Sequence, residues 1–143
     1  MSKHAPDHHD ADLVIKLYDL RREAVMRESR DAINGEWWPK NEAEMLAVMA
    51  PDHSLNRAFR QVGTYWEMVY GMAKHGVVNA EFLLENTGEG MLLYAKVEPY
   101  LAAIRKHNSR AFVNAEWMVE NVEGDVAAAL LARFRGRIAQ MVG

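Results

Sequence analysis

Residues 54–75, SLNRAFRQVGTYWEMVYGMAKH, decide the fold of this 143-residue chain. Their apolar side chains recur at alternating steps of four and three residues, at Leu55, Phe59, Val62, Trp66, Val69 and Ala73. A second apolar stripe runs beside the first, at Ala58, Tyr65, Met68 and Met72. Together the stripes cover about half of a helix surface, which is typical of a helix packed by several neighbours. The stretch therefore predicts a central helix that Ser54 caps and that ends before Gly76.

The rest of the chain also has helical periodicity, interrupted by turn residues. It predicts further helices over 10–34, 41–50, 79–85, 91–107, 108–123 and 126–141, with a kink at Pro99. No segment has the sustained alternation of a strand, and no internal repeat is present. We expect an all-α fold: a single-domain bundle of about six to seven helices around the central helix, over residues 10–143. Residues 1–9 lack apolar periodicity and predict a flexible N-terminal arm.

Composition limits the classes of protein that this chain can belong to. Half of the residues are hydrophobic and 26% are charged, which is ordinary for a globular protein. The absence of cysteine excludes disulfides, thiolate metal sites and cysteine nucleophiles. There is neither the apolar core of a signal peptide nor a run of about 18 apolar residues, so we expect a cytoplasmic protein without membrane insertion. A net charge of −3 with both signs interspersed predicts no nucleic-acid partner.

Motifs of the common enzyme classes are missing. The sequence contains no dinucleotide or P-loop glycine motif, no His-Glu-x-x-His, no Gly-x-Ser-x-Gly and no Glu-x-x-His pair for a di-iron site. We therefore expect no catalytic residues and no cofactor. His4, His8 and His9, with Asp7 and Asp10, have side chains that can bind a transition metal. Because ligands on a flexible arm must offset its ordering entropy, we predict no metal site there.

Several charged residues lie where neighbours in the helix are apolar. Arg21 and Glu28 fall between two apolar stripes of the first helix, Glu98 and Arg105 repeat this spacing around Pro99, and Glu67 belongs to the central helix. Because a buried charge is costly unless it is paired, we predict that Arg21 pairs with Glu98 or Glu67, and Glu28 with Arg105 or another arginine. Two interpretations stay open: a structural ion-pair network, or a charged pocket in which these five residues bind a ligand.

Other residues are candidates for contacts with a partner. Trp37 and Trp38 in a linker, and Trp117 off the main apolar face of its helix, are candidate interface residues, although a linker tryptophan can also cover the core of its own chain. Gly63 and Gly71 inside the central helix indicate either close helix packing or a groove. Arg133, Arg135 and Arg137 suit the C-terminal end of a helix dipole better than a phosphate contact.

Several short stretches resemble an uncharacterised family of small helical bacterial proteins, a domain of unknown function. They are residues 17–23 (LYDLRRE) with Met26-Arg27-Glu28, residues 65–68 (YWEM), residues 74–78 (KHGVV), and residues 98–101 (EPYL) with Arg105. The resemblance spans roughly residues 13–105 and does not include the chain from Asn108 onward. It implies an all-α fold, and it carries no established activity and no site residues.

From these observations we expect a non-enzymatic, cytoplasmic helical module that works through protein–protein contacts, including self-association. The alternative is a small-ligand-binding protein or enzyme with a charged pocket between helices. A cavity lined by the five charged residues would favour the alternative, whereas a closed ion-pair network would argue against it.

Overall fold

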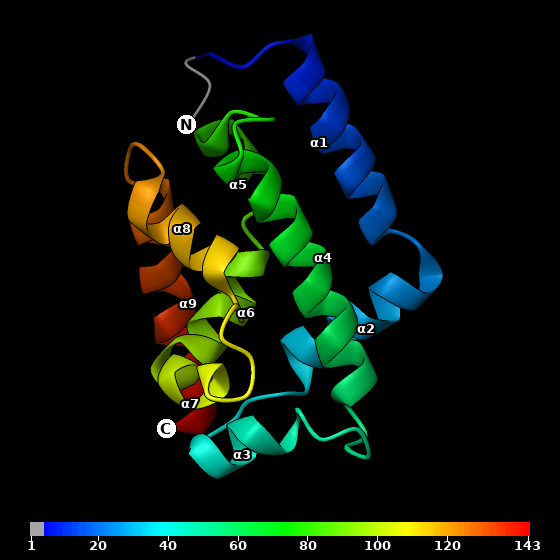
Figure 1. The fold of residues 1–143 in the computed structure, drawn as a ribbon, viewed down its shortest axis with the longest axis vertical. Helices are drawn as coiled ribbons and strands as arrows, with labels where there is room; N and C mark the ends of the chain where they lie inside the picture. Colours follow the sequence, from blue (N-terminus) through cyan, green and yellow to red (C-terminus); the bar gives the residue numbers. More distant parts are fainter. Residues whose placement is uncertain (1–4) are drawn as a thin grey trace.

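The central helix predicted at 54–75 is α4, Asn56–Lys74, and it crosses the middle of the structure (Figure 1). The computed structural model describes residues 5–143, which form helices and no strand. The α-helices are α1 His8–Arg21, α2 Ala24–Gly35, α3 Glu42–Ala47, α4, α5 Ala80–Asn86, α6 Gly90–Val97, α7 Leu101–Arg105, α8 Val113–Asn121 and α9 Val126–Val142, and η1, Glu98–Tyr100, is a 3-10 helix. The predicted all-α fold is confirmed.

The predicted first helix is two helices in the structure. Arg22 closes α1, and Glu23 adopts an extended conformation from which its carboxylate accepts a hydrogen bond from the Met26 backbone N–H at 2.9 Å. Glutamate is not among the preferred N-cap residues, so nothing in the sequence marked this start. The break turns α2 across the ends of α1 and α4 (Figure 1).

The first helix also begins earlier than predicted, at His8 rather than after Asp10. Asp7 is its N-cap, and Asp7 and Asp10 form a reciprocal capping box through each other's backbone N–H groups. Residues 8 and 9 of the expected arm therefore belong to α1, and residues 1–4, including His4, lie outside the described part of the chain.

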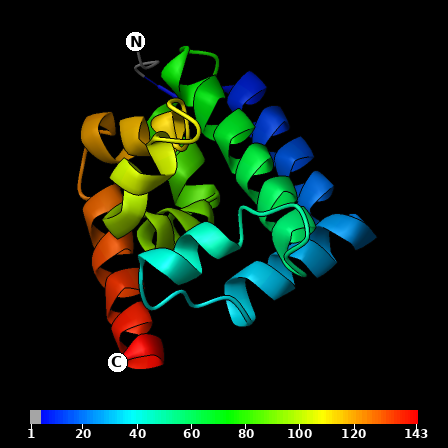
Figure 2. The same cartoon turned by 60° about the horizontal axis from the view of Figure 1, so that its bottom comes forward.

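Pro99 interrupts the helix predicted over 91–107, as the sequence indicated. The segment consists of α6, the 3-10 helix η1 that contains Pro99, and α7. Every residue of α6 is buried, because α9 covers α6 along one side and α8 and α2 also pack against it. Figure 2 shows α3 and its flanking loops closing the end of the bundle.

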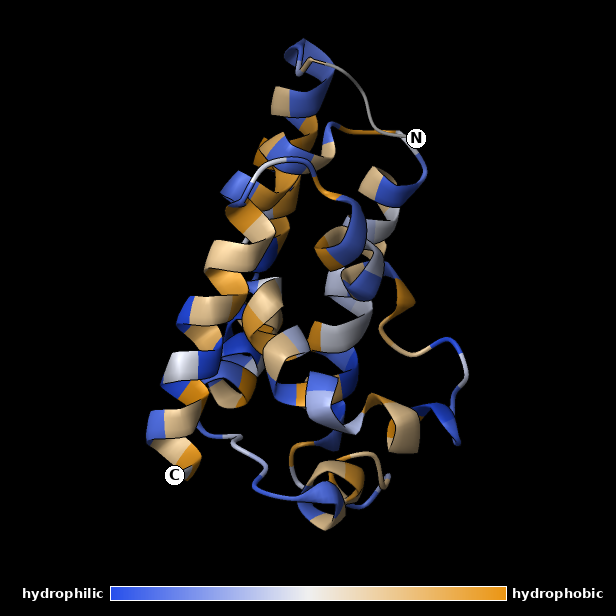
Figure 3. Ribbon diagram, turned by 90° about the vertical axis from the view of Figure 1, so that its left-hand side faces the viewer, coloured by the Kyte–Doolittle hydropathy of each residue, from blue (hydrophilic) through white to orange (hydrophobic). Residues whose placement is uncertain are grey.

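One continuous core joins all of these helices. Its largest buried side chains include Tyr70, Leu17, Ile33, Met45, Leu83 and Met91. Hydropathy alternates along α9, whose inner positions Ala127, Leu131 and Phe134 are buried in this core (Figure 3). No helix of residues 5–143 is long and apolar enough to cross a membrane.

The aromatic side chains of α4 form the centre of the core. The rings of Trp66 and Tyr70 stack at a centroid distance of 5.6 Å, and Tyr65 meets Trp66 edge to face at 5.0 Å. Gly90, the first residue of α6, lies so close to these rings that a Cβ would come within 2.6 Å of Trp66. The close approach of α6 to α4 therefore requires glycine at this position.

We predict that Trp66→Ala lowers the free energy of unfolding by about 3–5 kcal/mol, because it leaves a cavity beneath α1 and α6. The control is Met68→Ala on the exposed side of the same helix, for which we expect a change within about 0.5 kcal/mol. Urea denaturation measures both. Equal midpoints for the two variants would mean that Trp66 does not hold the core together.

Candidate functional site

The five charged residues predicted to form one network lie in separate places, and the predicted pairings are wrong. Glu98 pairs with Arg135 of α9 at 2.6 Å, and Arg105 pairs with Glu116 of α8 at 3.3 Å. Both partners lie in the last third of the chain, where nothing in the sequence marked them as facing charges. Glu28 is exposed and lines an open groove between α2 and the start of α4.

Glu67 binds backbone rather than an arginine. Its carboxylate oxygens accept hydrogen bonds from the N–H groups of Asn114 and Ala115, at 3.0 and 2.8 Å. These are free N–H groups of the first turn of α8, so Glu67 caps α8 from a neighbouring helix. Burial raises the pKa of the Glu67 carboxyl, and the two backbone hydrogen bonds oppose this shift. Gly71 packs against Asn114 beside this cap, which is the close packing that the glycine indicated.

A cleft of about 310 Å³ adjoins Glu67, between α4 and the loop that leads into α8. Its lining is largely apolar and includes Met49, Phe59, Gly63, Ile104 and Phe112, with Arg60 and Arg110 among the lining residues. Phe112 has a φ of 58°, in the left-handed region that a phenylalanine rarely adopts. Backbone strain of this kind concentrates at functional sites. Gly63 thus opens a cleft, whereas Gly71 serves packing.

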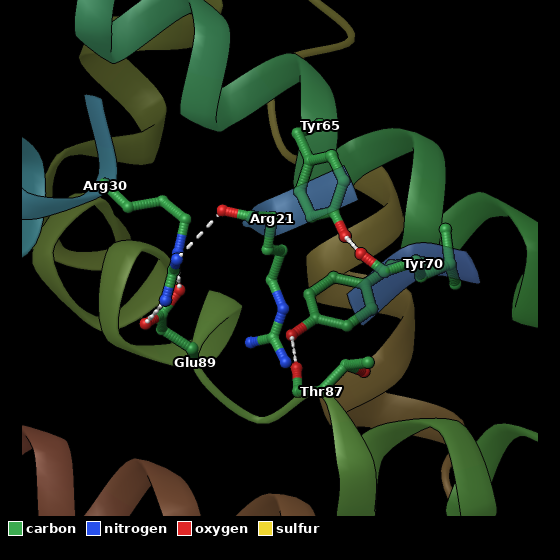
Figure 4. A network of polar contacts seen from close by, with 7 residues as sticks. Arg21, Arg30, Tyr65, Tyr70, Thr87 and Glu89 are labelled. Atoms are coloured by element: carbon green, nitrogen blue, oxygen red, sulfur yellow. Dashed lines mark hydrogen bonds and ion pairs between the residues drawn. The ribbon is translucent and has the colours of Figure 1, made fainter. Parts of the chain in front are cut away.

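A second group of polar side chains gathers where α1, α2 and α4 meet the start of α6. Figure 4 shows Arg21 and Arg30 facing Tyr65, Tyr70, Thr87 and Glu89. Arg30 forms a double hydrogen bond with Glu89, from Nε to Oε2 at 2.6 Å and from Nη2 to Oε1 at 2.7 Å. This pairing raises the pKa of Arg30 further, and Arg30 also donates to the Arg21 carbonyl at 3.2 Å.

The two tyrosines of this group hold backbone carbonyls. The Tyr65 hydroxyl donates to the carbonyl of Leu17, and the Tyr70 hydroxyl donates to that of Thr87 at 2.8 Å. Burial raises the pKa of Tyr65 to about 12 and that of Tyr70 well above 10, so both phenols stay protonated donors. They attach α1 and the loop before α6 to the central helix.

Arg21 lies in this group without an acidic partner. Its guanidinium packs over the rings of Tyr18 and Trp66, 4.9 and 5.6 Å from their centroids, and the residue is 8% exposed. Its Nε is the one buried side-chain nitrogen or oxygen within residues 5–143 that has no hydrogen-bond partner. The sequence marked Arg21 as a buried charge, but it did not reveal Arg30 and Glu89.

Exposed apolar side chains concentrate around the corner between α1 and α2. Seven large apolar residues are exposed in the described chain, and four of them are Ile15, Tyr18, Leu20 and Val25. Ile15 is the most exposed of all, at 66%. We call these four residues the corner patch.

The tryptophans predicted as interface residues face the molecule's own core. Trp37 is buried at 5% exposure, which corrects its assignment as an exposed candidate, and its ring meets Phe59 edge to face at 5.3 Å. Trp38 and Trp117 are half-buried and pack against the core. Trp37 covers part of the core because the linker after α2 packs against the body of the protein.

Lys96 is a buried cation that the sequence analysis missed. Its ammonium donates to the carbonyls of Ile33 and Trp37, at 2.7 and 2.6 Å, and lies 3.6 Å from the Trp38 ring centroid. It therefore ties the C-terminal end of α2 and the following linker to α6. Burial, with Arg137 nearby, lowers its pKa to about 7. Its position as the single lysine inside the apolar run of residues 91–97 is the sequence signal that could have identified it.

Within residues 5–143, no group of three or more histidine, aspartate or glutamate side chains is placed to hold a metal ion. Asp10 contributes instead to structure, since its carboxylate accepts a hydrogen bond from the Asn79 backbone N–H at 3.1 Å and links α1 to the start of α5.

The fold and these sites define an all-helical bundle with a small apolar cleft and, within residues 5–143, a buried arginine without an acidic partner. A family described as a domain of unknown function (DUF4760) matches residues 6–122, and the chain belongs to this family. The match agrees with the resemblance seen in the short motifs and extends it through α8. No curated protein matches the sequence. No solved structure matches it.

We predict that the stability of the protein rises with pH between 7 and 9 through Lys96. Over this range the unfolded lysine, with a pKa of 10.5, keeps its proton, whereas the folded lysine with a pKa of about 7 loses it. The unfolded state then binds more protons, so the free energy of unfolding increases with pH, by about 2 kcal/mol.

Urea denaturation at several pH values tests this prediction, with Lys96→Met as the reference without the titrating group. A difference between wild type and Lys96→Met that stays constant from pH 7 to 9 would contradict it.

Proposed function

We propose that the protein is a non-enzymatic, cytoplasmic helical module that self-associates through the corner patch, Ile15, Tyr18, Leu20 and Val25. The single observation that carries this proposal is the concentration of these exposed apolar side chains within eleven residues of sequence. Exposed apolar side chains are costly in water, and where they gather they mark sites of protein contact. Tyrosine is among the residues that contribute most to such contacts.

The charges around the patch support a second copy of the chain as the partner. Exposed Lys16 and Arg22 alternate with exposed Asp19 and Glu23 along the same segment. A surface that carries both signs in equal number can pair with itself under two-fold symmetry, whereas a surface of one sign would repel its copy.

We predict that replacing Ile15 and Leu20 together by serine shifts the protein from dimer to monomer, because it removes apolar area from the contact. Sedimentation equilibrium over a concentration series reaching about 1 mM measures the change. The control is Met141→Ser, which alters an equally exposed apolar residue at the other end of the chain. A wild type that is monomeric at every concentration would refute self-association, and equal dimerisation of all three proteins would place the contact elsewhere.

The α4–α8 cleft supports a second candidate function, the binding of a small molecule. Its volume of about 310 Å³ lies at the lower limit for small-ligand sites. An apolar floor with Arg60 and Arg110 beside it suits a ligand with an apolar body and an anionic group.

We predict that anilinonaphthalene sulfonate, an apolar anion, binds this cleft and that Gly63→Leu abolishes its fluorescence enhancement. A Cβ at Gly63 has room, 4.0 Å from the Phe112 ring, so the added side chain fills the cleft without displacing α8. The control is Gly136→Leu in α9, where a Cβ meets nothing within 4 Å. Fluorescence that is unchanged by Gly63→Leu would exclude the cleft as the dye site.

A further inference from the structure

Arg21 is a buried cation without a counter-ion, and this makes it unlike the other arginines near it. It is more than nine-tenths buried, and its side chain forms no hydrogen bond or ion pair with any residue that the structure describes. Burying a guanidinium is costly unless charge and hydrogen bonds compensate for the lost water. The aromatic faces of Tyr18 and Trp66 supply part of this compensation, but they accept no hydrogen bond from Nε.

The acid of this network is bound to the other arginine. Both carboxylate oxygens of Glu89 bind Arg30 in the double hydrogen bond. The network in Figure 4 thus holds two guanidinium groups and one carboxylate, which leaves one positive charge uncompensated. Glu67 and Glu98, the acids predicted from sequence to pair with Arg21, are bound elsewhere.

The groups around the guanidinium supply no negative charge of their own, and the start of a helix lies nearby. The hydroxyls of Tyr65 and Tyr70 are held as neutral donors to backbone carbonyls, so no phenolate can form beside it. The positive end of the dipole of α6 begins at Gly90, against Trp66 and Tyr70. Figure 4 shows the guanidinium directed into the space between Glu89 and Tyr70, above Thr87.

We propose that Arg21 is the anchor of an oxyanion-binding site that takes a carboxylate or phosphate group of a small molecule. The Nε and a terminal nitrogen of a guanidinium form a planar fork that matches two oxygens of either group. Such a ligand supplies both the charge and the acceptor that the folded chain leaves out. The buried Nε is the unsatisfied donor of the fork, and a terminal nitrogen supplies its second contact. This site does not depend on the proposed self-association.

The test uses inorganic phosphate and acetate as probes, titrated against the full chain at constant ionic strength with chloride as the reference anion. The readouts are the Nε–Hε NMR signal of Arg21 and the thermal midpoint. We expect a saturable shift of this signal and a rise in the midpoint with at least one probe, and the tighter probe identifies the group as phosphate or carboxylate. A signal that does not shift, or that shifts equally in chloride, overturns the proposal.

Variants separate binding at Arg21 from binding elsewhere. Arg21→Gln removes the charge, and the exposed neighbour Arg22→Gln is the matched control. We expect binding to be lost in the first variant and kept in the second. Arg21→Lys retains the charge without the fork, and we expect affinity about tenfold weaker, which also covers the case in which Arg21→Gln does not fold. Affinity equal to wild type in Arg21→Gln or Arg21→Lys refutes the assignment.

Discussion

The aromatic side chains of α4 bind the helices of this protein to one another through both their rings and their hydroxyls. Tyr65 holds α1 by the Leu17 carbonyl, and Tyr70 holds the loop before α6 by the Thr87 carbonyl. Between them, the ring of Trp66 stacks on Tyr70 and lies in close contact with Gly90. A buried ring excludes water from these hydrogen bonds, which makes each one more costly to break. The position of α1 and α6 relative to the centre follows from this arrangement.

Charged side chains join helices at two other points. Each one forms hydrogen bonds with backbone groups that are left unsatisfied at the end of a neighbouring helix. Lys96 donates to carbonyls at the C-terminal end of α2, and Glu67 accepts N–H groups at the start of α8. Helix ends leave such groups unsatisfied, and the charge has the sign that each dipole end favours. These two charges are consistent with a structural role, and neither needs a ligand.

Arg21 differs because no backbone carbonyl or acidic side chain of residues 5–143 accepts a hydrogen bond from its guanidinium. Its surroundings resemble the other junctions in burial and aromatic content, yet the acceptor is missing within the described chain. Three residues of the corner patch, Ile15, Tyr18 and Leu20, lie on α1, the helix that also carries Arg21. The two features have separate physical causes, apolar area in water and an unpaired charge in the core.

Local sequence patterns determined the secondary structure and the central helix of this protein. The apolar steps along residues 54–75 predicted α4, and Pro99 predicted the break between α6 and α7, because periodicity and proline geometry act within a few residues. The burial of Arg21 was also visible from its two apolar neighbouring stripes.

The partners of the charges were decided only by the tertiary structure. Glu98 meets Arg135 and Arg105 meets Glu116 because of how α8 and α9 dock, and no pattern along one helix specifies the rotation of another. The break at Glu23 likewise depends on a cap that an atypical residue forms. Periodicity reports which face of a helix is apolar, but pairing of charges depends on distances between helices that are remote in sequence, and only packing sets those distances.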